Sequence, residues 1–276
     1  MIRKPKLPIR ILIYAVLVFI LIIINLPFIW MVITSFKTEE EVFSWPPKFY
    51  PTLFNFDNYK GAFDLIPMTK LVLNSVFVAG AVTALQLVLN SLAAYGLSRF
   101  KFKGRDFVFM LLIGTLMIPA EVIIIPMYVI VKNMGMLNSY ASLIVPFMSS
   151  AFGIFLLRQF FLGIPKELED AAFMDGAGRM KIFWKIILPM AKPALWTTAI
   201  FSFLGRWNSY MWPLVAINDP DKQMIQVGLS QFSGDWMTQW TWKMAASTTA
   251  VIPIIIFFFF IQKQYVEGIS GVGIKG

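Results

Sequence analysis

The sequence predicts an all-α membrane protein that crosses the bilayer six times. Hydrophobic residues make up 58% of the 276 residues and charged residues only 14%, whereas soluble domains carry about 25% charged residues. Six apolar segments reach the roughly 20 residues that a helix needs to span a bilayer. We expect one transmembrane domain covering residues 1–276, with spans at about 11–35, 71–98, 107–131, 140–162, 191–217 and 244–262.

The first expected span follows a cluster of basic residues, as the apolar core of a signal peptide does. Its apolar character continues from residue 11 through residue 31 without a small-residue cleavage site. This run is too long for the core of a signal peptide. We therefore expect a retained span, and a cleaved signal peptide is the alternative.

Basic residues indicate the orientation of the spans. With the N-terminus inside, the inner segments and helix ends hold 16 of the 24 Lys and Arg residues but only 6 of the 15 Asp and Glu residues. Because cytoplasmic loops of membrane proteins are enriched in Lys and Arg, both termini are expected in the cytoplasm. The positive net charge then reflects topology. Without a soluble basic surface, no nucleic-acid partner is expected.

The residue types that are missing exclude several functions. The chain has no His and no Cys, which removes imidazole bases, thiol nucleophiles, disulfides and the common transition-metal ligands. We therefore predict no catalytic residue, no metal site and no cofactor. The phosphate-binding pattern G-x-x-x-x-G-K-[S/T] is absent, and the G-x-G-x-x-G match at 271–276 lacks the strand and helix that its nucleotide-binding use requires. If ATP drives this protein, another polypeptide must bind it.

A charged loop at 163–190 interrupts the apolar C-terminal half of the chain. So polar a segment cannot lie in hydrocarbon, and we expect it in water at the inner membrane surface. A short helix should begin after Pro165, with acidic residues at the end where the helix dipole favours them. It should end at Gly176. Its contact face is expected to carry, at helical spacing, Leu168, Ala171, Ala172 and Asp175.

The second half of this loop alternates apolar and basic side chains at helical spacing. Met180, Phe183, Trp184 and Ile187 form an apolar stripe opposite two lysines. This pattern is typical of a helix lying in the headgroup region of a membrane. On periodicity alone, an ordinary amphipathic surface loop explains the segment equally well.

The spacing within the loop resembles the EAA loop of the permeases of ABC importers. Asp170, Ala171 and Ala172 are followed after three residues by Gly176, and after nine more by the Ile-Ile-Leu-Pro sequence at 186–189. Asp170 is a departure, because the family usually has Glu there. The resemblance implies a coupling helix that docks on a separate ATPase through Glu169, Asp170, Ala171, Ala172, Asp175 and Gly176.

The same resemblance implies the other parts of such a transporter. These are a second permease subunit, most simply in a heterodimer, a cytoplasmic ABC ATPase dimer that binds the ATP, and an extracytoplasmic solute-binding protein, with membrane lipids around the spans. The chain would then be a multi-pass protein of a bacterial or archaeal inner membrane. It would contribute half of the translocation pore and would not itself be an enzyme.

Other segments resemble the carbohydrate-importing branch of that family. They lie at 92–100, 117–119 with 125–126, 137–140, 207–208, 212–214, 264–268 and 273–276. In that branch the tail reaches the ATPase, which implies such a role for Gln264, Tyr265, Glu267 and Gly268. An ABC permease for a glycerophosphodiester, an amino acid or a peptide is the alternative. A membrane-embedded enzyme is disfavoured because no acid, base or metal-ligand cluster is available.

Polar residues inside the expected spans mark a candidate substrate path. Buried polar groups in membranes face other helices or a water-filled cavity, and sugars present hydroxyls to amides and C–H faces to aromatic rings. Hydrogen bonding between helices is the simpler explanation for Ser75, Thr83 and Ser91. The candidates for lining the path are Trp207, Asn208, Tyr210, Trp212, Asn74, Asn90 and Glu121.

Overall fold

A computed structural model describes the backbone of residues 7–233 and 239–272 and the side chains as far as residue 262. Its elements in these ranges are helices, with no strand among them, so the predicted all-α class is confirmed. The chain divides into two compact units, which we describe separately. The first comprises Met1–Met68 with Leu229–Val251, and the second comprises Thr69–Gly228 with Ile252–Gly276.

Among the residues that the structure describes, four helices are long and apolar enough to cross a membrane. They are Leu7–Thr34 (α1), Met68–Arg99 (α4), Tyr140–Leu162, which comprises α7, η2 and α8, and Trp240–Gln262 of α15. Two bent helix pairs also pass this test, Arg105–Met117 with Ala120–Asn133 and Arg179–Met190 with Lys192–Trp207, and counting each pair as one span gives up to six among the described residues. The structure of the described residues is therefore that of a polytopic helical membrane protein.

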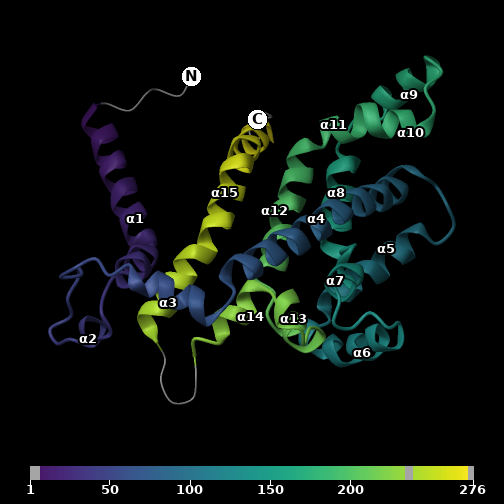
Figure 1. The fold of residues 1–276 in the computed structure, drawn as a ribbon. Coiled ribbons are helices and arrows are strands. Elements are labelled where there is room, and N and C mark those ends of the chain that lie inside the picture. The colour runs from purple at the N-terminus through teal and green to yellow at the C-terminus, as the bar shows by residue number, and fades with distance from the viewer. Residues whose placement is uncertain (1–6, 234–238, 273–276) are drawn as a thin grey trace. The chain divides into compact units, whose positions relative to one another are not determined.

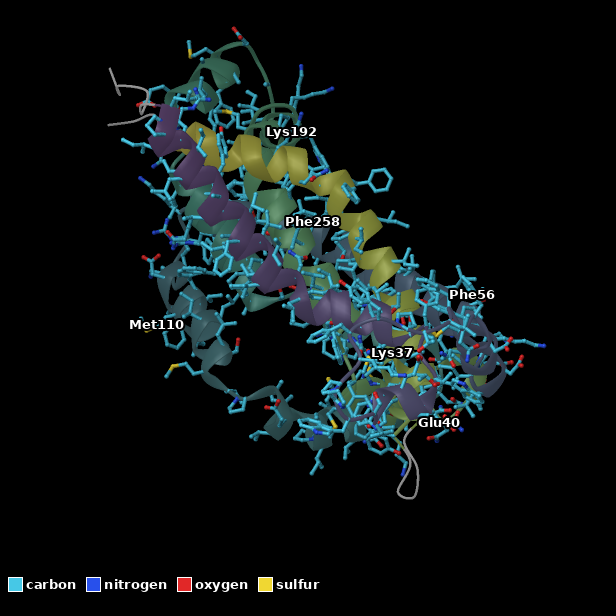
Figure 2. The ribbon with its side chains drawn as sticks, turned by 90° about the vertical axis from the view of Figure 1, so that its left-hand side faces the viewer. Lys37, Glu40, Phe56, Met110, Lys192 and Phe258 are labelled. Carbon is cyan, nitrogen blue, oxygen red and sulfur yellow. The ribbon has the colours of Figure 1, made fainter. Side chains whose placement is uncertain are left out.

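The segment expected to form one span at 107–131 is broken in the middle. Helix α5 (Arg105–Gly114) continues through η1 (Thr115–Met117), and α6 (Ala120–Asn133) then leaves at an angle of 106° (Figure 1). The break lies at Pro119, which cannot donate a backbone hydrogen bond and forces Ile118 before it into an extended conformation. Figure 2 shows Met110 on α5 projecting away from the ribbon.

The segment expected at 191–217 is also discontinuous. Helix α12 (Lys192–Trp207) ends where Asn208 leaves the helical conformation, and α13 (Met211–Ala216) begins after Tyr210. Pro213 explains the interruption, because in a continuous helix its ring would clash with the carbonyl four residues earlier, at Ser209. Hydropathy does not register such a break because the flanking residues are apolar on both sides.

The first unit is held together by buried polar contacts around its two short helices, α2 (Glu39–Val42) and α3 (Asp57–Leu65). The Glu41 carboxylate accepts the N–H groups of Thr38 and Thr52 at 3.1 and 2.7 Å. Lys37 is fully buried, and its ammonium lies 4.2 Å from the centre of the Trp30 ring. Figure 2 labels Lys37 within this group of packed side chains.

The start of α15 (Trp240–Val272) is attached to the same unit. The Glu39 carboxylate accepts the backbone N–H and the hydroxyl of Thr241, both at 2.9 Å. At this helix N-terminus, a carboxylate stabilises the unpaired N–H groups and the positive end of the dipole. Gly61 of α3 lies against the Trp242 indole so closely that a Cβ atom would overlap the ring.

In the second unit, α4 packs along the other helices through polar side chains. Asn74 donates to the carbonyls of Asp221 and Gln223 at 2.9 and 3.0 Å, and Gln86 donates to Phe147 at 2.7 Å. Asn90 accepts from the Ser149 hydroxyl at 2.9 Å and the Ser150 N–H at 3.0 Å, which fixes the start of α8. The remaining elements are α7 (Tyr140–Ile144), η2 (Val145–Phe147), α8 (Ala151–Leu162), α9 (Glu167–Met174), α10 (Arg179–Ile182), η3 (Phe183–Ile187), α11 (Leu188–Met190), η4 (Pro220–Lys222) and α14 (Ile225–Ser230).

Candidate coupling surface and solute cavity

The helix expected in the charged loop is α9, and its two ends are built as the sequence indicates. Three acidic residues occupy its first turn. At the other end Gly176 adopts a left-handed conformation, with φ of 75°. Its N–H donates to Phe173 at 3.0 Å, and the Ala177 N–H donates to Ala172 at 2.9 Å. This pair of bonds is the Schellman motif, which turns the chain sharply and leaves α9 as a short projecting helix.

The expected contact face of α9 is divided by the packing. Ala171 and Asp175 are exposed, as are Asp170 and Gly176 next to them. Ala172 is half-buried and packs against the hydrophobic core beneath. The surface that α9 presents outward is therefore built on Ala171, and Ala172 attaches the helix to its own protein.

Glu169 is buried, so it does not belong to the exposed surface. Its carboxylate lies 2.5 Å from Nε of Arg99, and both side chains are more than nine-tenths buried. Arg99 ends α4, and its Nη2 donates to the carbonyl of Ile164 at 2.9 Å. Burial raises the pKa of the Glu169 carboxyl, and the attraction of Arg99 opposes that rise. The family resemblance implies that Glu169 is one of the coupling residues. Its contact with Arg99 joins α9 to the end of α4 and keeps Glu169 out of the exposed surface.

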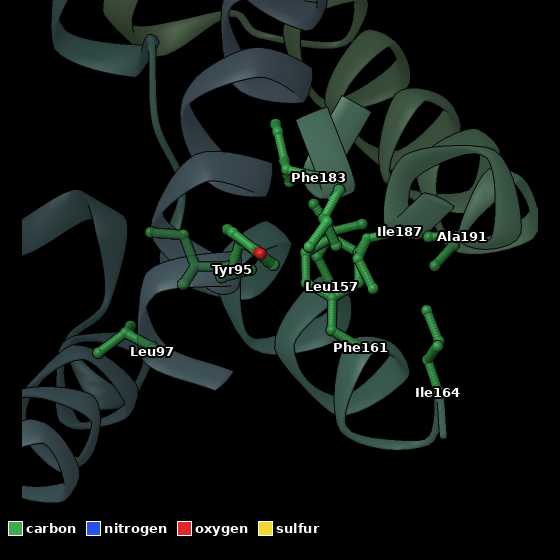
Figure 3. Packing of buried hydrophobic residues seen from close by; sticks show 12 residues of the cluster. Tyr95, Leu97, Leu157, Phe161, Ile164, Phe183, Ile187 and Ala191 are labelled. Carbon is green, nitrogen blue, oxygen red and sulfur yellow. The ribbon is translucent and has the colours of Figure 1, made fainter. Parts of the chain in front are cut away.

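A hydrophobic cluster lies beneath the loop (Figure 3). Tyr95 of α4 packs against Phe183, with ring centres 4.9 Å apart, and its hydroxyl donates to the carbonyl of Arg179 at 3.4 Å. Leu157 and Phe161 of α8 complete the centre and are fully buried. The loop at 163–190 is thus packed against α4 and α8. It is a folded surface and not a free connection.

The expected apolar stripe at 180–187 is only partly exposed. Phe183 and Ile187 are fully buried in the cluster, so the interpretation as a helix lying wholly in the headgroup region was wrong for them. Met180 and Trp184 are exposed. The stretch Phe183–Ile187 forms a π-helix, in which the Leu188 N–H donates to Phe183. Pro189 follows immediately and has no N–H to continue the α-helical ladder.

A cavity of about 440 Å³ lies where the two broken spans meet within the second unit. This volume falls in the roughly 300–1,000 Å³ range of small-molecule sites. Four of the predicted path residues line it, namely Glu121, Asn208, Tyr210 and Trp212. Glu121 stands in the first turn of α6, after the break at Pro119, and Asn208 and Tyr210 form the break between α12 and α13. The helix interruptions thus supply much of the cavity wall.

The other three predicted path residues do not line this cavity. Trp207 is completely buried, and Asn74 and Asn90 make the interhelical hydrogen bonds already described. Asn74 also accepts from the Tyr140 hydroxyl at 2.8 Å. A polar residue in an apolar helix indicates burial, but its position in the sequence does not indicate whether the partner is a helix or a cavity.

Several residues of the cavity were not among the predicted candidates, and two of them contact each other. Arg206 and Phe147 both line it, and the Arg206 guanidinium lies 3.9 Å from the centre of the Phe147 ring. The signal for Arg206 was present, because a charged residue within a membrane-spanning segment is a functional candidate by default. Phe147 carries no such signal among the 27 phenylalanines of the chain.

The predicted tail residues Gln264, Tyr265, Glu267 and Gly268 lie within the helical backbone of α15, but their side chains lie outside the described residues. Within the described part of the chain, no group of three or more His, Cys, Asp and Glu residues is placed to hold a metal ion.

Comparison with known proteins identifies the family of this chain. A family described as "Binding-protein-dependent transport system inner membrane component" matches residues 86–270. The polygalacturonan/rhamnogalacturonan transport system permease protein YtcP of Bacillus subtilis is 37% identical over 280 residues, covering 96% of this chain and 97% of that protein. The sn-glycerol-3-phosphate transport system permease protein UgpE of Brucella abortus is 32% identical over 266 residues, covering 93% and 94% of the two chains.

A solved structure also resembles this chain over nearly its whole length. It is a crystal structure of a bacterial ABC transporter involved in the import of the acidic polysaccharide alginate. The matched chain has a TM-score of 0.79 and 26% sequence identity, with 95% of this chain and 99% of that chain covered.

Proposed function

The chain belongs to the family of inner membrane components of binding-protein-dependent transport systems, and we propose that it imports a carbohydrate as half of a heterodimeric pore. It is the multi-pass permease component of an ABC transporter and not an enzyme, since ATP hydrolysis belongs to a separate subunit of such transporters. The likeness to a polygalacturonan permease over almost the whole chain carries the proposal of a sugar or oligosaccharide substrate. The resemblance to the alginate importer points the same way.

The exposed surface of α9 is our proposed docking site for the ATPase. Ala171 is small and exposed, so a partner can approach the backbone closely there. We expect Ala171→Trp to weaken co-purification of the ATPase and to reduce transport at equal membrane abundance. Lys103→Trp, at an exposed position outside the loop, is the matched control and should change neither. Normal ATPase association of the Ala171 variant would refute this docking site.

We propose that both termini and the coupling loop lie in the cytoplasm. The excess of Lys and Arg in the assigned inner segments supports this orientation. Reporter fusions after residues 103, 178 and 270 should therefore report a cytoplasmic location, and fusions after 60, 135 and 235 an external one. A reversed result at a single loop would overturn the assigned topology.

The subunit composition is tested by reconstitution. We expect solute-stimulated ATP hydrolysis to require this chain, a second permease subunit, the ATPase pair and a solute-binding protein. Full transport without the second permease would favour a homodimer. Removal of residues 265–276 should impair hydrolysis or coupling but not membrane insertion, because we place the tail at the ATPase.

A second candidate substrate is a phosphorylated polyol. The extensive likeness to the sn-glycerol-3-phosphate permease favours it specifically. Uptake assays with the reconstituted transporter separate the two functions. Import of an oligosaccharide supports the carbohydrate proposal, whereas import of sn-glycerol 3-phosphate alone supports the alternative.

A further inference from the structure

The cavity in the second unit contains a positive charge that no carboxylate among the described residues pairs with. Arg206 stands in the last turn of α12 and lines the 440 Å³ cavity. It also lines a neighbouring cavity of about 260 Å³, whose other polar residues include Gln86, Thr198 and Ser202. One guanidinium therefore borders both spaces, at the point where they approach each other.

Arg206 has no anionic partner among residues 7–233 and 239–262. No carboxylate in this range forms an ion pair with it, and its guanidinium donates no hydrogen bond there. Its contact is the face of Phe147, which leaves the edge of the guanidinium, where the N–H donors lie, available. A charged group in a membrane-spanning segment is costly, so a residue of this kind ordinarily pairs or serves a transported solute.

Helix capping is a simpler role that such an arginine could have. A cation near a helix C-terminus is stabilised by the dipole and often donates to the last carbonyls. Here two of the final carbonyls of α12, those of Leu204 and Arg206, accept the backbone N–H groups of Asn208 and Ser209, and the guanidinium donates to none of the last carbonyls. The guanidinium lies on Phe147 instead. Capping therefore does not explain where the side chain is placed.

The remaining lining defines what solute would fit. Glu121 offers acceptors for hydroxyl groups, Asn208 offers an amide, and Tyr210 offers an aromatic ring with a hydroxyl. No ion pair joins Glu121 to Arg206, so the two charges remain separately available within the cavity. A solute with several hydroxyls and one anionic group matches this arrangement. Arginine binds a carboxylate with two parallel hydrogen bonds, which a neutral sugar cannot accept in the same way.

We propose that Arg206 selects an anionic solute, and specifically that the substrate is an acidic saccharide carrying a carboxylate. This inference rests on the proposed carbohydrate function and specifies its substrate class. A phosphate group would engage the same guanidinium, so the shared chemistry is an anion on a hydroxyl-rich solute. The experiment must separate these two sources of negative charge.

The test measures binding to the purified complex of this chain with its second permease and ATPase pair in lipid nanodiscs. The solute-binding protein is omitted, so that only the membrane cavity is measured. The probes are trigalacturonate, its neutral methyl ester and sn-glycerol 3-phosphate. The variant Arg206→Gln removes the charge. The variant Arg206→Lys keeps the charge but cannot form the two parallel hydrogen bonds of a guanidinium. Lys192→Gln removes the other basic residue of α12 and is the matched control.

We expect the wild-type complex to bind trigalacturonate more tightly than the ester. Arg206→Gln should weaken trigalacturonate binding about tenfold to a hundredfold, as expected for the loss of charge-assisted hydrogen bonds. Binding of the ester should not change, Arg206→Lys should recover part of the loss, and Lys192→Gln should bind like the wild type.

Two results would overturn the inference, namely equal wild-type affinity for the acid and the ester, or unchanged trigalacturonate binding in Arg206→Gln. Failure of all three probes to bind would count against it as well. Binding of sn-glycerol 3-phosphate alone, lost in Arg206→Gln, has a different meaning. That result would refute both the proposed carbohydrate function and the proposed acidic-saccharide substrate, but it would support the anion-binding role of Arg206.

Discussion

Replacing Arg99 by Gln is the sharpest test of how α9, the proposed coupling helix, is held. Arg99 makes two contacts with the loop, the ion pair with Glu169 and the hydrogen bond to the Ile164 carbonyl. The variant leaves the buried carboxylate without a cation and the carbonyl without this donor. We expect α9 to detach from the end of α4 for part of the time, while the hydrophobic cluster keeps the rest of the loop in place.

The loss of docking free energy in this variant follows from the cost of protonating the Glu169 carboxylate. The detached loop would return Glu169 to water, where its pKa is near the ordinary value of 4.5. Remaining docked in the variant at pH 7 requires protonation of the carboxyl, which costs at most about 3.4 kcal/mol at 1.36 kcal/mol per pKa unit. The lost hydrogen bond adds about 0.5–1.5 kcal/mol. The sum agrees with the roughly 3–5 kcal/mol measured when one partner of a buried ion pair is removed.

The sign of the pH dependence also follows. Burial already raises the Glu169 pKa in the docked state, and removing Arg99 raises it further because the attraction that opposed the rise is gone. A carboxyl with a raised pKa takes up a proton on docking. Docking in the variant is therefore strongest below about pH 4.5 and weakens about tenfold per pH unit up to the raised pKa. In the wild type the same dependence is expected over a narrower pH range.

Hydrogen exchange of peptides covering residues 163–178, corrected for intrinsic rates, measures this equilibrium at pH 6, 7 and 8. The Arg99→Gln protein should exchange faster than wild type in these peptides, and increasingly so at higher pH. The double variant Arg99→Gln/Glu169→Gln has no carboxyl at position 169 and should show no such pH trend. Wild-type exchange in the single variant, or acceleration independent of pH, would refute the assignment of Glu169 to the docking contact.

Two further predictions concern the first unit. Gly61→Ala should lower the melting temperature of the purified protein, because the added Cβ overlaps the Trp242 indole and overpacking typically costs about 1–3 kcal/mol; Gly80→Ala, where a Cβ meets nothing within 4 Å, is the control, and equal melting temperatures would contradict the contact. Hydrogen bonds from Thr52 lower the Glu41 pKa below 4.5, so their stabilisation is present above pH 4.5 and lost as pH falls through the lowered value. Exchange at 38–59 should accelerate on such acidification in wild type, and an identical acid response in Glu41→Gln would exclude this carboxylate as the cause.

Sequence periodicity predicted the helical class and the ends of α9 because both depend on local chemistry. Apolar runs of sufficient length, acidic residues in a first turn and a glycine at a C-terminus act within a few residues of themselves. The burial of Glu169 could not be predicted, for a different reason. Its partner Arg99 is 70 positions earlier in the chain, and spacing within α9 contains no information about that contact.

The cavity shows the same limit of prediction from sequence. Pro119 and Pro213 are visible in the sequence, and each is a plausible helix break. Whether the two breaks face each other depends on tertiary packing, so the sequence could propose Glu121 and Asn208 separately but not as one wall. Asn74 and Asn90 were equally plausible by composition, and only their bonds to other segments identify them as packing residues.

Helix α4 contacts both α9, the proposed coupling helix, and a residue that lines the cavity. The C-terminal end of α4 carries Arg99, which holds α9. Farther along the same helix, Gln86 binds the carbonyl of Phe147, the residue on whose ring Arg206 rests. A continuous helix transmits axial displacement with little compression because its backbone is hydrogen-bonded throughout. A shift of α9 that moved α4 would therefore disturb the hydrogen bond from Gln86 to the Phe147 carbonyl. Because Arg206 packs on the Phe147 ring, the position of the Arg206 guanidinium in the cavity would change as well.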